Sequence, residues 1–497
     1  MPASALTILD EKLKRIHTLG SVGSLLGWDE QVNLPKESKD QRQNQKALMS
    51  RLVHEANTDS EIEKLLAELE SSWDELAERE KVIVREKRRN YDRAVKLPAE
   101  FVERCTRTSS EAYHAWAEAR ANDDFKSFAP YIQKHIELCL ESAGYLGWED
   151  RPYDLMIDNH DPGMDASTVA ALFSELKTDL LPILTQILDS SVKPDISIFK
   201  GFPVNKQEAF LKDVTKSLGF NYERGRIDIS LHPFCSGNGA DIRMTTRFHE
   251  DNPLDSLFSS IHETGHGMYE QGLPIEYLHN ALGQAAGMGV HESQSRLWEN
   301  QVSRSKAFWK FYEPKFRETF KEQLQDISSE NLYLAINAVS RNPIRVDSDE
   351  VTYNLHIIIR FEIEKKLFAG ELQVADLPEY WNAQYSELLG IQPKNDAEGV
   401  LQDIHWSYGS FGYFPSYCLG NMLAAQLWYA ALEQLPGLES DFEKGEFSRL
   451  LAWLRENVHQ HGKTYYLKEL SEKATGQPLS PKSLIRYLKD RYLPLYS

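Results

Sequence analysis

The chain has 497 residues, of which 41% are hydrophobic and 26% are charged, an ordinary composition for a water-soluble globular protein. Its formal net charge of −19 argues against a nucleic-acid partner, because the phosphates would be repelled. No stretch reaches the roughly 18 apolar residues that a membrane-spanning helix needs, and residues 1–15 lack the apolar segment of a signal peptide. We therefore expect a cytoplasmic protein with no nucleic-acid partner and no membrane partner.

The four cysteines are far apart in the sequence and show none of the paired spacings of a metal site. We expect them to be free thiols, as is usual in a reducing compartment. No linker rich in glycine, serine or proline interrupts the chain, and it contains no internal repeat. We therefore expect a single large body with two lobes rather than a string of separate domains.

Helical apolar spacing dominates the chain from its start to about residue 148, and again at 165–188 and 206–218. The segments 226–231 and 241–245 instead alternate polar and apolar residues, as half-buried strands do. Turn-forming residues lie between them, which predicts an antiparallel β-hairpin. Helical spacing resumes at residue 254 and continues to the C-terminus. The chain is therefore predicted to be mainly α with a small antiparallel β-sheet.

The segment that follows the hairpin has clear helix boundaries. Asn252 and Pro253 are typical of a helix start, and Gly272 and Pro274 are typical of a helix end. Apolar residues between these points follow the spacing of a buried helical stripe. This helix therefore carries one face into the protein core.

His262, Glu263 and His266 bring two imidazoles and a carboxylate together near the edge of that stripe. Residues i and i+4 share one face of a helix, so both histidines can bind one metal ion. Glu263 lies next to the first histidine and can act as general base towards a water molecule. The alternative is a pair of hydrogen-bonded core histidines, which leaves Glu263 as a third buried polar group without a purpose. The pattern therefore predicts the helix of a zinc hydrolase.

A catalytic zinc ion usually has three protein ligands and one open position. The metzincin continuation needs glycine and then histidine after the second ligand, but the chain has Tyr269 and Gly272 there, which excludes that class. Glu292 is the first choice for the third ligand, because it opens a further helical stretch and Gly287 allows the chain to turn back. His291 is the competitor, and spacing does not separate the two.

The predicted hairpin has a functional interpretation as well, because a strand edge beside a zinc helix can hold a peptide by main-chain hydrogen bonds. The alternative is that the hairpin only braces the helix.

The motifs together resemble the carboxypeptidase Taq family of zinc metallocarboxypeptidases, in order and over almost the whole chain. One departure is Asp347-Ser348, where the family usually has Glu-Ala. The segments that carry the resemblance are 27–35, 232–234, 241–245, 262–266, 291–294, 344–349 and 399–406.

The resemblance implies a two-lobed, saddle-like helical fold with a deep groove, similar to that of neurolysin. It implies one catalytic domain over 1–497, with a helical N-terminal lobe at about 1–150 that covers the groove and a zinc-site core at about 220–420. It implies that His262, His266 and Glu292 bind Zn²⁺, and some members of the family also work with Co²⁺. Homodimers are common in the family.

The implied activity is the removal of single amino acids from peptides with a free C-terminus, with broad side-chain tolerance. Glu263 is then the general base. The oxyanion of the tetrahedral intermediate needs further donors, and the aromatic segment 405–417 contains several. By resemblance to related zinc peptidases we favour His405 and Tyr417 for this role, and Tyr408 and Tyr413 are further candidates.

A carboxypeptidase must also recognise the free α-carboxylate, for which the fork of an arginine is suited. Arg345 is the first choice because it lies in a segment that the family shares, and Arg243 is the second. Asp347 and Asp349 are candidates to orient either Arg345 or a metal-ligand imidazole. His232 is a further candidate for substrate binding, since it begins another shared segment.

Two other functions remain open at this point. The same site could serve an oligopeptidase or a dipeptidyl carboxypeptidase. A non-catalytic helical binding protein with a structural metal is also conceivable, although it needs no Glu263.

Overall fold

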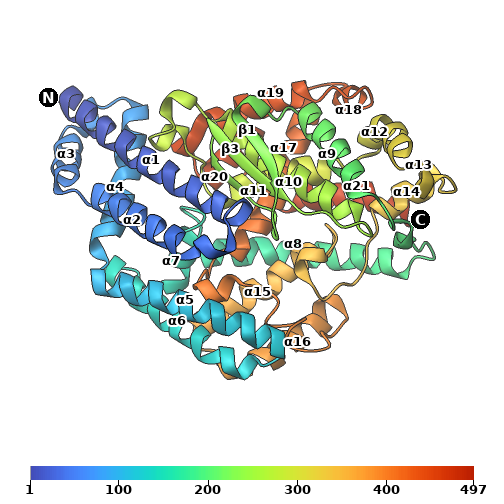
Figure 1. Cartoon of the computed structure of the whole chain (residues 1–497), viewed down its shortest axis with the longest axis horizontal. Coiled ribbons are helices and arrows are strands. Elements are labelled where there is room, and N and C mark those ends of the chain that lie inside the picture. The colour runs from blue at the N-terminus through green and yellow to red at the C-terminus, as the bar shows by residue number, and fades with distance from the viewer. Residues whose placement is uncertain (1) are drawn as a thin grey trace. The chain divides into compact units, whose positions relative to one another are not determined.

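The computed structural model describes residues 2–497 and is built mainly of helices, as predicted (Figure 1). The backbone divides into two compact units, each assembled from three separate parts of the chain. The first unit takes the chain up to Val95, Asp195–Ile336 and Gln426–Pro478, and the second takes Lys96–Pro194, Asn337–Ala425 and Leu479–Ser497. The expectation of one catalytic domain over residues 1–497 stays a prediction.

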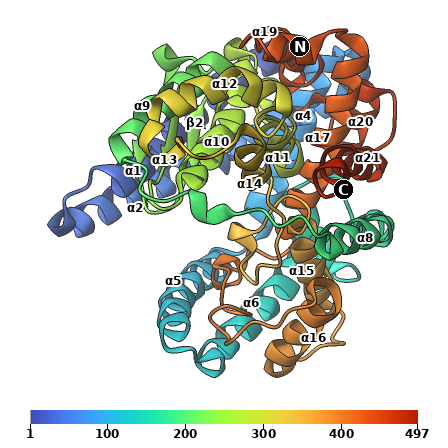
Figure 2. The same cartoon turned by 90° about the vertical axis from the view of Figure 1, so that its right-hand side faces the viewer.

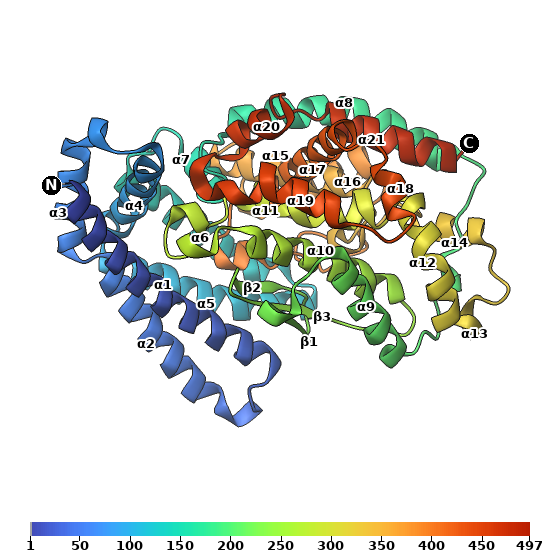
Figure 3. The ribbon, with the colours of Figure 1, turned by 90° about the horizontal axis from the view of Figure 1, so that it is seen from above.

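The first unit contains the N-terminal helices, the strands and the helix with the His-Glu-x-x-His motif. In Figures 1 and 3 the two N-terminal helices lie side by side. Its helices are α1 (Pro2–Val32), α2 (Lys39–Asn57), α3 (Ser60–Ser71), α4 (Glu78–Lys96), α9 (Val204–Leu218), α10 (Pro253–Gly272), α11 (Met288–Arg296), α12 (Lys306–Thr319), α13 (Lys321–Leu324), α14 (Ser329–Ile336), α18 (Leu438–Phe442), α19 (Ser448–Asn457) and α20 (Leu467–Thr475).

The second unit is helical in all its regular elements among the described residues. Figure 2 shows two of its long helices, α5 and α6, running next to each other. Its helices are α5 (Ala99–Asn122), α6 (Phe125–Leu146), α7 (Pro152–Asp158), α8 (Ala166–Asp189), α15 (Tyr353–Phe368), α16 (Leu377–Leu389), α21 (Lys482–Tyr492) and the first part of α17 (Phe414–Gln434).

The small sheet is confirmed, but it is mixed rather than antiparallel. Its strands β1 (Gly225–Ile229), β2 (Cys235–Asn238) and β3 (Asp241–Thr246) lie in the order β1-β3-β2. The predicted hairpin between 226–231 and 241–245 is wrong, because β1 runs parallel to β3. The residues taken for a turn form β2, which is the true antiparallel partner of β3. Alternation marks a strand but carries no information about the direction of its partner.

The two faces of the sheet pack against different helices. Ile242 and Met244 are fully buried on the face towards α10, where a side chain added at Gly267 would lie 3.2 Å and 3.0 Å from them. On the other face Arg226 and Arg243 are register partners, and both guanidinium groups lie over the ring of Trp28 in α1, at 5.1 Å and 4.2 Å. The sheet therefore joins the N-terminal helix to the motif helix.

Helices α10 and α11 approach each other so closely that only glycine fits at their crossing. A Cβ atom on Gly265 would lie 2.5 Å from the Cα atom of Ser295 and 2.6 Å from the carbonyl oxygen of Gln294. The absence of a side chain therefore lets the backbones meet between the two histidines of the motif.

In the second unit a buried carboxylate organises the segment before α17. Glu364 of α15 accepts hydrogen bonds from the indole of Trp406, the backbone N–H of Gly412 and the hydroxyl of Tyr153, at 2.7–2.9 Å. These bonds hold the loop between His405 and Phe414 in one conformation. Among residues 2–497, no helix combines the length and the apolar character that crossing a membrane requires.

Candidate active site

Helix α10 has the boundaries that its sequence predicts. The side chain of Asn252 accepts a hydrogen bond from the backbone N–H of Asp255, Pro253 opens the first turn, and the helix ends before Leu273. His262 and His266 therefore lie one turn apart on one face, with their ring centroids 4.8 Å apart.

Three side chains converge in the way that a metal site requires. One possible ligand atom each from His262, His266 and Glu292 lies within 4.8 Å of the others. The Nε2 atoms of both histidines lie 3.5 Å from the same carboxylate oxygen, Oε2 of Glu292. The donor set of two imidazoles and one carboxylate fits a zinc ion with an open fourth position. The structure therefore brings together the three residues selected from the sequence.

The other ring nitrogen of His262 has a carboxylate partner that sequence reasoning missed. Nδ1 of His262 lies 2.8 Å from Oε2 of Glu299, which sits in a π-helix at Leu297–Val302 directly after α11. Burial alone would raise the pKa of Glu299, but the charge of Arg296 and the bond with His262 lower it to about 2. The spacing of Glu292, Arg296 and Glu299 (i, i+4, i+7) was the available signal.

The second histidine has a different kind of partner. Nδ1 of His266 lies 2.5 Å from Nδ1 of His291, and Nε2 of His291 lies 3.0 Å from Oε1 of Glu270. Both ring nitrogens of His291 are therefore engaged, one with His266 and the other with Glu270, whereas the carboxylate of Glu292 faces the two histidines of the motif.

Glu263 is 8% exposed and lies next to the first histidine of the group. Burial raises its pKa to about 7, partly offset by the nearby imidazole of His262. A carboxyl group with a pKa near neutrality can both accept and return a proton at physiological pH.

Arg345 of the second unit is 5% exposed and is held by a partner that the sequence did not suggest. Its Nε and Nη2 atoms donate to Oδ1 of Asp403 at 3.0 Å and 2.8 Å, and Nη1 donates to the hydroxyl of Tyr353 at 3.0 Å. The prediction that Asp349 orients Arg345 is wrong, because that carboxylate caps the start of α15 through Val351 and Thr352. Arg345 and Asp403 lie 58 positions apart in the sequence, so no local pattern links them.

Three of the predicted aromatic residues form one cluster beside Arg345. The hydroxyl of Tyr417 lies 3.4 Å from Nε2 of His405, and the ring of Tyr413 lies 5.3 Å from the rings of both. Burial and the charge of Arg345 lower the pKa of His405 to about 3, so this imidazole is neutral at physiological pH. The guanidinium carbon of Arg345 lies 5.2 Å from the ring centre of Tyr417.

Tyr408 is placed differently from these three residues. Its side chain is 49% exposed, and its ring stacks on Tyr113 of α5 at 5.7 Å.

The remaining two candidates lie on and beside the sheet of the first unit. Arg243 pairs with Asp241 at 3.1 Å and stacks on Trp28. His232 is exposed in the connection from β1 to β2, and its carbonyl oxygen accepts a bond from Ser230.

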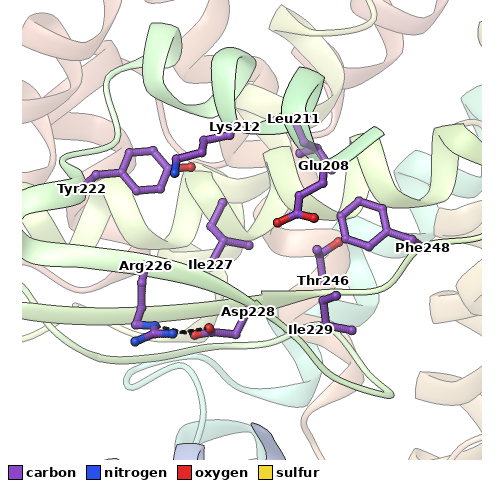
Figure 4. Close-up of a pocket in the computed structure, with 10 residues that line it drawn as sticks. All are labelled: Glu208, Leu211, Lys212, Tyr222, Arg226, Ile227, Asp228, Ile229, Thr246 and Phe248. Atoms are coloured by element: carbon purple, nitrogen blue, oxygen red, sulfur yellow. Dashed lines mark hydrogen bonds and ion pairs between the residues drawn. The ribbon is translucent and has the colours of Figure 1, made fainter. Parts of the chain in front are cut away.

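A separate cavity of about 180 Å³ lies between α9 and the outer side of β1 (Figure 4). Lys212 and Glu208 face it from the helix, while Arg226 and Asp228 form an ion pair on the strand. None of the predicted site residues lines this cavity.

A family model described as carboxypeptidase Taq (M32) metallopeptidase matches residues 8–492. The chain is 41% identical to thermostable carboxypeptidase 1 of Thermus thermophilus, over 100% of this chain and 99% of the relative. It is 39% identical to carboxypeptidase 1 of Bacillus subtilis, over 97% of both chains. The crystal structure of an M32 carboxypeptidase from Deinococcus radiodurans R1 superposes with a TM-score of 0.96 at 41% identity, over 99% of both chains.

The fold and the three converging side chains are those of a metal-dependent peptide hydrolase. The chain belongs to the carboxypeptidase Taq (M32) family of metallopeptidases. Membership supports carboxypeptidase activity on peptides and the need for a metal ion. The resemblance stated from the sequence motifs is thereby confirmed.

Proposed function

We propose that this protein is a zinc-dependent carboxypeptidase that releases single amino acids from the C-termini of peptides with broad specificity. The observation that carries the proposal is the group of His262, His266 and Glu292 beside the buried carboxyl of Glu263, in a chain of this family. Zn²⁺, with Co²⁺ as a working substitute, is the proposed metal. When bound, it supplies a Lewis acid at the reaction centre.

Glu263 accepts the proton of the attacking water and passes it to the leaving amine. Its burial supports this role, because a pKa of about 7 leaves the group able to act in both directions. His405 and Tyr417 donate hydrogen bonds to the developing oxyanion, and Tyr408 and Tyr413 are weaker candidates for a place near the substrate. The neutral state of His405 supports its role as a donor rather than as a charged group.

Arg345 binds the α-carboxylate of the substrate. A guanidinium has five N–H groups, and the three hydrogen bonds to Asp403 and Tyr353 use one on each nitrogen. One N–H on each terminal nitrogen therefore remains available to the oxygens of a carboxylate. Asp403 keeps the fork in a fixed orientation. Arg243 is the weaker candidate, because it already serves an ion pair and a stacking contact.

The free edge of β2 holds the main chain of the peptide. β2 is an outer strand of the sheet, and a cavity of about 380 Å³ lies between it and α1. Main-chain bonds to a strand edge are indifferent to side chains, which supports broad specificity. His232 lies in the loop that enters β2 and is a weaker candidate for contact with the peptide.

The family resemblance supports two further proposals, that the chain acts as one catalytic domain and that it forms a homodimer. The cytoplasmic location expected from the sequence stays a proposal as well. Light scattering of the purified protein tests the homodimer, since a monomer at working concentrations would exclude it.

The product pattern from one unblocked peptide tests the proposed function. A carboxypeptidase produces a ladder of single-residue losses from the C-terminus, which mass spectrometry resolves, and no products form after removal of the metal with a chelator. A C-terminally amidated copy of the peptide is the matched control and should be cleaved poorly. Internal fragments or released dipeptides would instead identify an oligopeptidase or a dipeptidyl carboxypeptidase.

A further inference from the structure

His291 joins His266 to a carboxylate that lies outside the three-residue group. Its Nδ1 atom lies 2.5 Å from Nδ1 of His266, and its Nε2 atom lies 3.0 Å from Oε1 of Glu270. We propose that His291 and Glu270 are positioning residues that fix the tautomer and the ring orientation of His266, so that its Nε2 lone pair points to the metal. This inference rests on the proposed function, since it takes His266 as a ligand.

The direction of each hydrogen bond follows from the chemistry of imidazole. A histidine that binds a metal through Nε2 carries its hydrogen on Nδ1 and must donate from there. Nδ1 of His291 is then the acceptor, so the hydrogen of that ring sits on Nε2. Glu270 accepts this second bond. With His266 as a ligand, this arrangement of protons satisfies His266, His291 and Glu270 together and keeps Nε2 of His266 as a lone pair.

The packing holds this chain of bonds in place. Glu270 lies four residues after His266 on α10, and the backbone of His291 is bound into α11 by the carbonyl oxygen of Gly287. The ring of His291 lies 4.6 Å from the ring of His266 and 5.1 Å from the ring of Tyr269. This relay, formed by His266, His291 and Glu270, therefore spans the same two helices whose close approach forms the metal site.

The two ligand histidines are oriented by different means. His262 bonds directly to the carboxylate of Glu299, whereas His266 reaches the carboxylate of Glu270 through a second imidazole. Outer partners of this kind typically contribute 10- to 100-fold in metal affinity. His291, which spacing alone does not separate from Glu292 as a ligand, thus has a separate role.

Zinc affinity of the full-length protein tests the relay. The metal-free protein is titrated with Zn²⁺ in competition with a chromogenic chelator. His291→Leu removes the acceptor and should weaken zinc binding by about 10- to 100-fold. His291→Asn places an amide oxygen where Nδ1 was and should recover most of that loss. His54→Leu, at an exposed position in α2, is the matched control and should bind zinc like the wild type.

A second pair of variants tests the far end of the relay. Glu270→Leu should weaken zinc binding, and Glu270→Gln, which keeps an acceptor for His291, should retain most of the affinity. The thermal unfolding midpoint of each metal-free variant should stay near that of the wild type. If a His291 variant fails to fold, the zinc affinities of the two Glu270 variants decide whether the acceptor at the end of the chain of bonds matters.

The outcomes separate the relay from the metal site itself. His266→Leu should abolish stoichiometric zinc binding, and normal binding by that variant would overturn the proposed site rather than the relay. Wild-type affinity in His291→Leu, alongside loss of binding in His266→Leu, would overturn the relay. An Asn variant as weak as the Leu variant would also overturn it, because the acceptor would then not be what matters.

Discussion

At the scale of single residues, the chemistry depends on buried groups whose protonation is set by their surroundings. Glu263 and Glu364 are both buried carboxyl groups with a pKa near 7, but they belong to different environments. Glu263 lies beside the candidate metal ligands, whereas Glu364 is surrounded by three hydrogen-bond donors in the second unit. We expect the first to act in the reaction and the second in stability.

Replacement of Glu263 by glutamine should remove the general base and keep the shape of the site. We expect kcat to fall by about 10²- to 10⁴-fold, because general acid–base catalysis contributes that much. Zinc content, measured on the purified variant, should stay at the wild-type level. Turnover at the wild-type rate would exclude the general-base role.

Replacement of Arg345 by alanine should remove the preference for a free C-terminus. Two charge-assisted hydrogen bonds are lost, so kcat/KM for an unblocked peptide should fall by about 10- to 100-fold. Cleavage of the amidated peptide should change little, and Asp403 keeps its ion pair with Arg360 at 2.6 Å. An unchanged ratio between the two peptides would exclude Arg345 as the anchor.

The buried carboxyl of Glu364 should make stability depend on pH. Burial raises its pKa from 4.5 to about 7 in the folded chain, so the folded state binds more protons than the unfolded state between these values. Stability therefore falls as the pH rises from 4.5 to 7, by about 3 kcal/mol for this group. Urea unfolding of the wild type and of Glu364→Gln at several pH values measures the difference.

The glutamine variant stays neutral, so the wild type should lose stability relative to it across this window. Glu37→Gln, at an exposed position, is the control and should leave the pH profile unchanged. Parallel profiles for the wild type and Glu364→Gln would contradict the assignment.

At the scale of elements, the site depends on how closely α10 and α11 approach each other. Gly265→Ala would place a Cβ atom 2.5 Å from the backbone of Ser295, so the helices must move apart. We expect the free energy of unfolding to fall by about 1–3 kcal/mol and zinc affinity to fall with it. Chemical denaturation and the chelator titration measure the two effects.

Gly20→Ala in α1 is the matched control for this substitution. A side chain at Gly20 would meet no atom within 4 Å, so alanine should stabilise the helix by about 0.5–1 kcal/mol. Equal effects from the two substitutions would show that close helix packing at Gly265 is unimportant.

At the scale of the whole molecule, each unit is closed by segments that are far apart in the sequence. The last 19 residues belong to the second unit, where Tyr487 donates to the buried carboxylate of Glu350 at 2.8 Å. Tyr492 donates to the same carboxylate, and Tyr496 accepts a bond from the backbone of Val339. The C-terminal segment therefore binds to residues that lie more than 130 positions earlier in the sequence.

Removal of residues 479–497 should destabilise the second unit by leaving Glu350 buried without these partners. We expect loss of cooperative unfolding and of activity, measured by circular dichroism during heating and by peptide hydrolysis. Removal of Ser497 alone is the control, because its side chain is exposed. A truncated protein that unfolds like the wild type would contradict this account.

Much of the candidate site could be predicted from the local periodicity of the sequence. The helix at Pro253–Gly272 and the shared face of its two histidines were predicted because capping residues and an i, i+4 spacing act within one helix. The mainly helical fold and the presence of a small sheet were predicted for the same reason. The direction of β1 relative to β3 was not, because alternation is the same in parallel and antiparallel strands.

The sequence by itself therefore determined the elements and the chemical types at the metal site, since these depend on neighbours a few residues away. Only the tertiary structure decided the partners of those groups. Glu299 beside His262, His291 between His266 and Glu270, and Asp403 beside Arg345 all depend on contacts between separate elements. Such contacts arise from the packing of helices around glycine crossings and buried charges, which no single segment encodes.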